Sequence, residues 1–167
     1  MEMLARDAKA FEYFIDPDDE SFATPKNMPE KICTYCEKTG QGKPESDGAM
    51  IRCIYESLAM KYRFAIKQIE ENTGKKFDVL HLLGCGTKDN FLCQMTADSL
   101  NIDVIAGPTE ATALGNIILQ LIALGDIEDV NTGRQIIKSS EKLTAYKSEN
   151  ASDFDKNYDK FVKILNK

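Results

Sequence analysis

The most constraining feature of the sequence is a change of hydrophobic period near Gly74. From Asp47, the expected N-cap, to Asn72 the spacing of apolar residues predicts a helix of about seven turns that ends before Gly74. Its apolar residues recur at every third or fourth position: Ile51, Ile54, Leu58, Tyr62, Ala65, Ile66 and Ile69. The next apolar run, Phe77–Leu83, is short and nearly continuous, which is typical of a buried parallel strand. This change of period indicates an α/β fold.

A glycine turn and a helix lead from this strand to a second one. Gly84–Thr87 forms the turn, a helix is expected over about 89–100, and the second strand is Val104–Ala106. Parallel strands joined in this way have a right-handed crossover and end at the same edge of the sheet, where a ligand would bind. A second turn, Ala106–Ala111, opens another helix at that edge. Two turns side by side favour a ligand cleft there.

The rest of the chain is predicted to be helical. Further helices are expected through Leu4, Ala8, Phe11 and Phe14, over Pro29–Lys38, Thr109–Leu124 and Asn131–Ser139, and in a C-terminal segment with Phe154, Tyr158, Phe161, Val162 and Leu165 on one face. The helix over Thr109–Leu124 is apolar nearly all round, which predicts that it is buried. The C-terminal helix is expected to dock on the domain.

The helices outnumber the two expected strands. Two parallel strands alone expose an edge on each side, so either further strands are hidden in the sequence or they belong to chain outside it. An open edge also predicts self-association.

Composition limits the class of protein. The 167 residues, 43% hydrophobic and 29% charged, suit one globular domain. A net charge of −6 without a basic stripe argues against a nucleic-acid partner. The longest weakly polar run, Thr112–Gly125, is shorter than the ~20 residues of a membrane span and contains Asn116 and Gln120. No secretory signal opens the sequence, so a cytoplasmic protein without a membrane partner is expected.

The cysteines and the single histidine do not predict a metal site. The five cysteines, an odd number in a chain without an export signal, are expected to be reduced: Cys33, Cys36, Cys53, Cys85 and Cys93. Cys33 and Cys36 have the spacing of a zinc knuckle or a redox pair, but no second close pair follows, so buried thiols are favoured. His81 lies inside the first expected strand, which favours a core or sheet-face residue with one satisfied nitrogen over a catalytic base.

The turn from Gly84 to Asn90 is the main candidate site. Its backbone N–H groups and the following helix dipole are suited to an anion. It lacks the dinucleotide-binding fingerprint, because Asp89 stands three residues after Gly86 where that motif has glycine, and it lacks the P-loop ending as well. On the residues alone, a nucleotide turn and a plain tight turn both remain open.

Several motifs together extend this interpretation. They are His81–Asn90, Leu92–Asp98, Val104–Asn116, Phe14–Asp19 and Arg52–Arg63. Their order and spacing, over about residues 4 to 165, resemble the C-terminal domain of the rhamnulokinases, a family within the FGGY group of carbohydrate kinases. The resemblance implies a partial ribonuclease-H-like, actin-like ATPase domain that is rich in helices and has a short parallel sheet.

The resemblance also implies an activity and a site. The activity is transfer of the ATP γ-phosphate to L-rhamnulose in L-rhamnose breakdown, with ATP and Mg²⁺ as cofactors. The nucleotide-binding residues would be Gly84, Cys85, Gly86, Thr87 and Asn90. Relatives normally have Gly-Gly-Gly in this turn, so the Cys85 side chain is expected to crowd the base or sugar of the nucleotide.

Residues 1–167 would correspond only to the C-terminal portion of such a kinase. The sugar-binding domain, the catalytic aspartate, a phosphate loop and three strands have no counterpart here, so the nucleotide is the expected partner and the sugar would bind only with the other half. Because phosphoryl transfer depends on positioning donor and acceptor, the isolated chain is expected to be inactive.

Other roles stay open. One alternative is a non-catalytic nucleotide- or protein-binding module, and another is a structural helical domain. The resemblance also allows Cys36 and Cys53 to come close enough for a disulfide, which a reducing cytoplasm disfavours.

Overall fold

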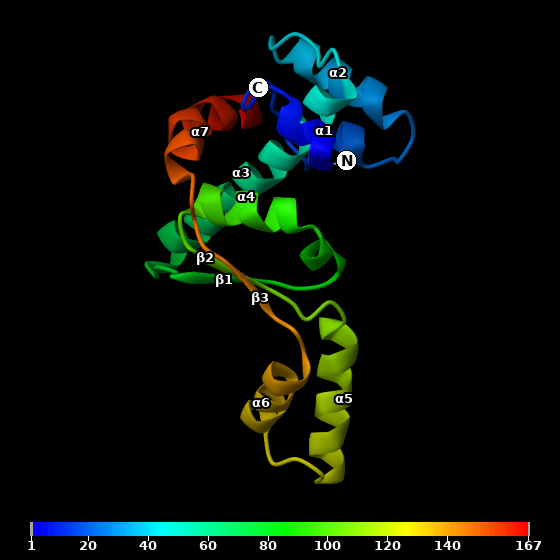
Figure 1. Cartoon of the computed structure of the whole chain (residues 1–167), viewed down its shortest axis with the longest axis vertical. Coiled ribbons are helices and arrows are strands. Elements are labelled where there is room, and N and C mark those ends of the chain that lie inside the picture. Colours follow the sequence, from blue (N-terminus) through cyan, green and yellow to red (C-terminus); the bar gives the residue numbers. More distant parts are fainter. Residues whose placement is uncertain (1, 167) are drawn as a thin grey trace.

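The computed structural model describes residues 2–166, which form helices around a small sheet (Figure 1). The helices are α1 (Glu2–Asp7), α2 (Met28–Lys38), α3 (Asp47–Thr73), α4 (Asn90–Leu100), α5 (Ala111–Leu124), α6 (Val130–Ser140) and α7 (Ala151–Leu165). The strands are β1 (Val79–Leu82), β2 (Asp103–Ala106) and β3 (Thr144–Tyr146), and two short 3₁₀ turns are η1 (Glu20–Phe22) and η2 (Cys85–Lys88).

The sheet has the order β1-β2-β3. β1 and β2 are parallel, with Leu80 opposite Val104, which confirms the strand–turn–helix–strand unit. β3 pairs antiparallel with β2 and places Tyr146 opposite Val104. The sheet is therefore mixed rather than purely parallel. β3 was missed because three residues are too few to show an alternating pattern.

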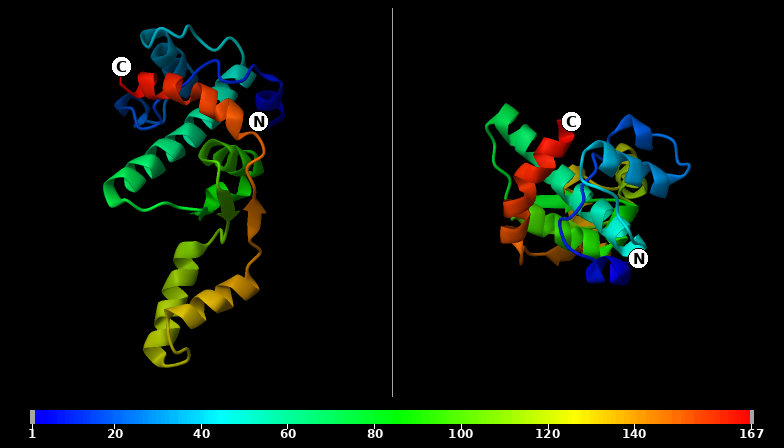
Figure 2. Two further views of the ribbon diagram at one scale, coloured as in Figure 1. Left: turned by 90° about the vertical axis from the view of Figure 1, so that its left-hand side faces the viewer. Right: turned by 90° about the horizontal axis from the view of Figure 1, so that it is seen from above.

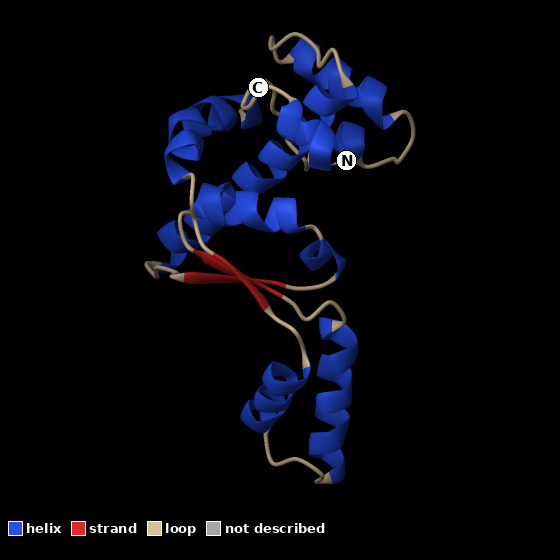
Figure 3. Cartoon of the chain, viewed as in Figure 1, coloured by secondary structure: helices blue, strands red, loops and turns tan. Residues whose placement is uncertain are grey.

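The sheet is covered on one face only. α4 lies over it, and α3 crosses beyond α4 (Figure 3). β1 alternates between half-buried Leu80 and Leu82 and exposed Val79 and His81. The expectation of a strand buried on both faces was thus wrong, because no helix of residues 2–166 packs on the second face. His81 lies on that open face, which confirms a sheet-face residue rather than a core one.

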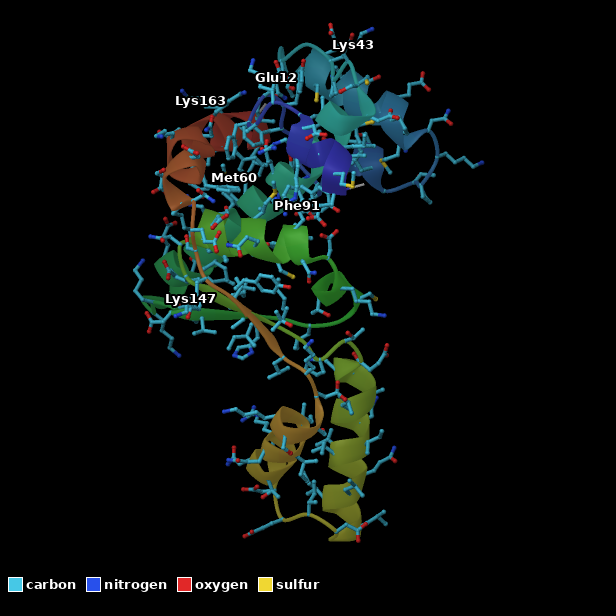
Figure 4. All side chains as sticks on the ribbon, viewed as in Figure 1. Glu12, Lys43, Met60, Phe91, Lys147 and Lys163 are labelled. Atoms are coloured by element: carbon cyan, nitrogen blue, oxygen red, sulfur yellow. The ribbon has the colours of Figure 1, made fainter. Side chains whose placement is uncertain are left out.

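The main core surrounds α3. It consists of buried side chains from α1, α3, α4, α7 and the segment before α2: Ala5, Phe14, Tyr55, Ala59, Met60, Phe91, Met95, Phe154, Phe161 and Ile164. Met60 and Phe91 lie in this side-chain-filled region (Figure 4). Phe14 and Phe161 pack edge to face with their centroids 5.6 Å apart, which confirms that α7 docks on the domain.

The ends of α3 show how the local sequence sets a helix. Ser46, not Asp47, caps the first turn, because its hydroxyl accepts a hydrogen bond from the Ala49 N–H at 3.1 Å. Gly74 ends the helix in the left-handed conformation at φ 68°.

The N-terminal helix is shorter than its apolar spacing predicts. It ends at Asp7, and Phe11 has φ 55°, which a helix does not allow. The Arg52 guanidinium donates hydrogen bonds to the carbonyls of Ala5 and Ala8 at 3.0 and 3.2 Å. The Glu56 carboxylate, only 1% exposed, accepts the Phe11 N–H at 2.7 Å. Side chains of α3 therefore bind backbone groups that a longer helix would have used.

α5 is not buried, contrary to its apolar composition. It forms a helical hairpin with α6 that projects from the sheet (Figure 2). Ile118 is its one buried residue, whereas Leu119 and Leu124 are 59% and 75% exposed. Gly133 allows the close approach of α6, since a Cβ there would lie 2.3 Å from the Ile118 side chain. Composition predicts burial only where a partner surface exists, and in residues 2–166 α6 covers one side of α5.

The cysteines are free thiols. Cys36 and Cys53 are buried together between α2 and α3, in a smaller cluster with Ile15 and Ile32. A hydrogen bond between the two thiols lowers the pKa of Cys36 and raises that of Cys53, and burial raises the Cys53 pKa further. The proximity is as expected, and no bridge is present.

Among residues 2–166, no helix combines the length and the apolar character that a bilayer crossing requires.

The buried ion pair of α3 generates a stability prediction. Glu56→Ala leaves the Arg52 guanidinium, 2.7 Å from the carboxylate in the native protein, and the Phe11 N–H without their partner. We expect a loss of about 3–5 kcal/mol in the free energy of unfolding, measured by urea denaturation. The exposed Glu71 of the same helix is the matched control, and Glu71→Ala should change stability by about 0.5 kcal/mol or less. A Glu56→Ala loss no larger than that of the control would contradict the anchoring role.

Candidate functional site

The two glycine turns meet at the edge of the sheet where β1 and β2 end. The Gly84 N–H donates to the Pro108 carbonyl at 3.2 Å, and the Gly107 N–H donates to the Leu82 carbonyl at 2.9 Å. The hydroxyls of Thr87 and Thr109 are 3.3 Å apart. The prediction that the two turns lie side by side is confirmed, and these contacts join them into one surface.

The two glycines of the first turn differ in whether the backbone conformation requires glycine. Gly84 adopts φ 85° and ψ −164°, which a residue with a Cβ rarely reaches. Gly86 has no positive φ, and a Cβ built on it would meet no atom within 4 Å. The fold of this chain therefore does not require glycine at 86. The open space above Gly86 would let another molecule come close to the backbone.

Cys85 and Thr87 flank Gly86 within η2, which follows Gly84 and precedes α4. Cys85 is exposed, so its side chain does not pack into the core between the sheet and α4. Thr87 is partly buried, and its hydroxyl donates to the Gly84 carbonyl at 2.7 Å. The Thr87 side chain thus closes the turn, while the Cys85 side chain remains accessible on it.

The N-terminus of α4 is occupied by the protein's own carboxylate. One oxygen of Asp89 accepts the Leu92 N–H at 3.1 Å and caps the helix. The other accepts the Tyr55 hydroxyl at 2.5 Å. The Asp89 charge would repel a phosphate at this N-terminus, so the turn is better suited to an uncharged sugar or base than to the anion expected from the helix dipole.

Tyr55 ties the turn to α3. Burial, followed by the hydrogen bond to Asp89 and the charge of that carboxylate, raises the pKa of Tyr55 to about 12. The sequence did not indicate Tyr55 as a site residue, although it lies four residues after Ile51 and three before Leu58, on the face that the apolar residues form. No pattern in the sequence indicates which side chain of α3 reaches Asp89.

Asn90, the first residue of α4, is exposed and also contacts β3. Its side-chain oxygen accepts a hydrogen bond from the Tyr146 hydroxyl of β3 at 2.7 Å. Both residues line a cavity of about 510 Å³ between α1, α4 and the start of α7. Gly84–Thr87 do not line this cavity, so the five candidate residues are adjacent but do not share one pocket. Tyr146 was missed together with β3.

The described part of the chain contains no cluster of three or more His, Cys, Asp or Glu side chains that could hold a metal ion. It thus offers Mg²⁺ no ligand cluster of its own.

Comparison with known proteins places this geometry in a family context. The profile of the C-terminal domain of the FGGY family of carbohydrate kinases matches residues 1–124. The rhamnulokinase of Bacteroides thetaiotaomicron is 38% identical over 154 residues, which are 92% of this chain and 32% of that protein. The rhamnulokinase of Bacillus subtilis is 40% identical over 148 residues, which are 87% of this chain and 30% of that protein. The chain therefore spans about a third of the length of these curated relatives.

Solved structures show the same fold. A gluconate kinase from Lactobacillus acidophilus has a TM-score of 0.59 at 21% identity, over 72% of this chain and 24% of that one. A xylulose kinase from the same organism has a TM-score of 0.60 at 21% identity, over 72% of this chain and 24% of that one. The expected partial actin-like fold is confirmed, with a mixed sheet in place of a parallel one.

The hydrogen bond between Tyr55 and Asp89 predicts a loss of stability at high pH. The pKa of Tyr55 is raised above its ordinary value of 10.0, so its contribution is fully present below pH 10 and is lost as pH rises towards about 12. The free energy of unfolding should fall more steeply over this range in the wild type than in Tyr55→Phe, as measured by urea denaturation at several pH values. Tyr62→Phe, which changes an exposed tyrosine of α3, should keep the wild-type slope. Equal slopes for wild type and Tyr55→Phe would show that Tyr55 does not couple to Asp89.

Proposed function

Because the chain belongs to the FGGY family of carbohydrate kinases, we propose that it forms the nucleotide-side portion of a rhamnulokinase. The reaction is transfer of the ATP γ-phosphate to L-rhamnulose, with Mg²⁺ as the metal. Support for this sugar comes from the curated relatives of 35–42% identity, which are named rhamnulokinases.

The observation that carries the proposal is the unexplained glycine at 86. Its backbone conformation is open to other residues and no atom of this chain fills the space above it. A turn that leaves such space beside a strand end fits close approach of a nucleoside. Residues Gly84, Cys85, Gly86, Thr87 and Asn90 are proposed to contact it, with backbone N–H groups and the Asn90 amide as hydrogen-bond donors.

The phosphate-bearing end of the nucleotide is proposed to extend away from α4. Asp89 holds a negative charge at the first turn of that helix and is fixed there by Tyr55. This chain would therefore hold and orient the nucleoside, while the groups that bind the sugar and remove the proton from its hydroxyl would lie in the other domain of the kinase. Such a division makes residues 1–167 the C-terminal portion of the enzyme.

Sugar kinase activity is expected only when this chain is joined by a sugar-binding domain. The purified 167-residue protein should not phosphorylate L-rhamnulose above background in a coupled assay that measures ADP, because phosphoryl transfer needs donor and acceptor held together. Adding the whole portion of a related rhamnulokinase that precedes the matched residues should give turnover. Turnover by the 167-residue chain alone would overturn the division of roles.

The exposed turn predicts opposite effects of two substitutions on ADP binding. Cys85→Gly removes a side chain where the nucleoside approaches and should tighten binding about fivefold to tenfold. Gly86→Ala fills the open space and should weaken it. Isothermal titration calorimetry measures both affinities, and melting temperatures should barely change because neither position is packed.

The matched control is Cys33→Ala on α2, which should leave ADP affinity unchanged. Unchanged or weaker ADP binding by Cys85→Gly would contradict the proposed contact.

A protein-binding module is the second candidate. The open face of the sheet and the exposed Leu119 and Leu124 of α5 favour it, since apolar surface of this kind is normally covered by a partner. A second copy of the chain, paired along the free edge of β1, is one such partner. If the wild type binds no ADP in the titrations above, this candidate replaces the first.

A further inference from the structure

We propose that Tyr146 is a positioning residue that holds the side chain of Asn90 so that its NH₂ group faces a bound nucleotide. The inference rests on the proposed nucleotide site and adds to it a residue from β3. The contact that carries it is the hydrogen bond from the Tyr146 hydroxyl to the Asn90 side-chain oxygen, 2.7 Å long.

Three elements fix this contact. β3 pairs with β2, and Tyr146 stands opposite Val104, which is fully buried on the face of the sheet that α4 covers. Asn90 is the first residue of α4, and its neighbour Asp89 is held from the other side by Tyr55 of α3. The start of α4 is thus attached by one tyrosine hydroxyl to α3 and by another to β3.

The chemistry follows from the shape of an amide. The two ends of an asparagine side chain are nearly equal in size, so a free amide presents either its oxygen or its NH₂ group to a ligand. With the oxygen occupied by the Tyr146 hydroxyl, two N–H donors remain. Burial, and then the neighbouring Cys93 and Asp89, raise the pKa of Tyr146, which keeps the phenol protonated and able to donate. Asn90 would therefore act as a donor toward an acceptor atom of the sugar or base.

The test is a double-mutant cycle on ADP affinity, measured by titration calorimetry on the full chain. Tyr146→Phe keeps the ring and removes the hydroxyl, and should weaken ADP binding about fivefold. Asn90→Ala should weaken it at least as much. If Tyr146 acts through Asn90, the double variant binds ADP no more weakly than Asn90→Ala alone. Tyr62→Phe is the matched control and should bind ADP like the wild type.

A second variant separates the donor role from the fold. Asn90→Asp keeps an acceptor for the Tyr146 hydroxyl but has no N–H to give, so its affinity for adenosine, a neutral probe, should fall as far as that of Asn90→Ala. If Tyr146→Phe lowers the melting temperature, the adenosine affinity of Asn90→Asp becomes the deciding measurement. Retained adenosine affinity in Asn90→Asp would overturn the proposal.

The outcomes distinguish the role of Tyr146 from the existence of the nucleotide site. Additive losses in the cycle, or no loss with Tyr146→Phe, would overturn the role of Tyr146 and leave the nucleotide site standing. A wild-type protein that binds neither ADP nor adenosine would overturn the proposed function, and the role of Tyr146 with it.

Discussion

The packing of α3 against its neighbours is the interaction on which the rest of the structure depends. Along about two turns of this helix, Arg52 and Glu56 bind the backbone of the N-terminal segment, Tyr55 binds Asp89 at the start of α4, and Met60 enters the core shared with α4 and α7. Each attachment involves a different part of the chain. α3 therefore sets where the sheet, the turn and the C-terminal helix lie relative to one another.

The proposed site lies at the border of this core. The turn after β1 lies outside the core, so its glycines and Cys85 have little packing to constrain them. Its order comes from hydrogen bonds at its borders, namely those of Gly84 with Pro108, Asp89 with Tyr55 and Asn90 with Tyr146. A rigid frame around an open backbone suits a surface that receives a ligand, since little of the frame must be reordered on binding. Under the proposed function, the acidic cap of α4 would favour an uncharged part of that ligand.

The same frame explains the exposed apolar surface. The sheet has helices on one face, and α5 and α6 support each other on the opposite side with only part of their apolar surface covered. Apolar surface of this kind is normally covered in a complete assembly. The related kinases are about three times as long as this chain.

Features that depend on residues near one another in the chain could be predicted from the sequence alone. The long helix, its end at Gly74, the parallel strand pair and the glycine turn all follow from local spacing and backbone preference, as does the family resemblance from the order of motifs. Three further features became visible only in the folded chain: Phe11 leaves the helix, β3 joins the sheet and α5 stays exposed. Phe11 is held by Glu56, and Tyr146 of β3 pairs with Val104 of β2. α5 stays exposed because, among the described residues, only α6 packs against it. Hydrophobic periodicity reports which side chains can be buried, but whether a surface arrives to bury them depends on residues distant in the chain.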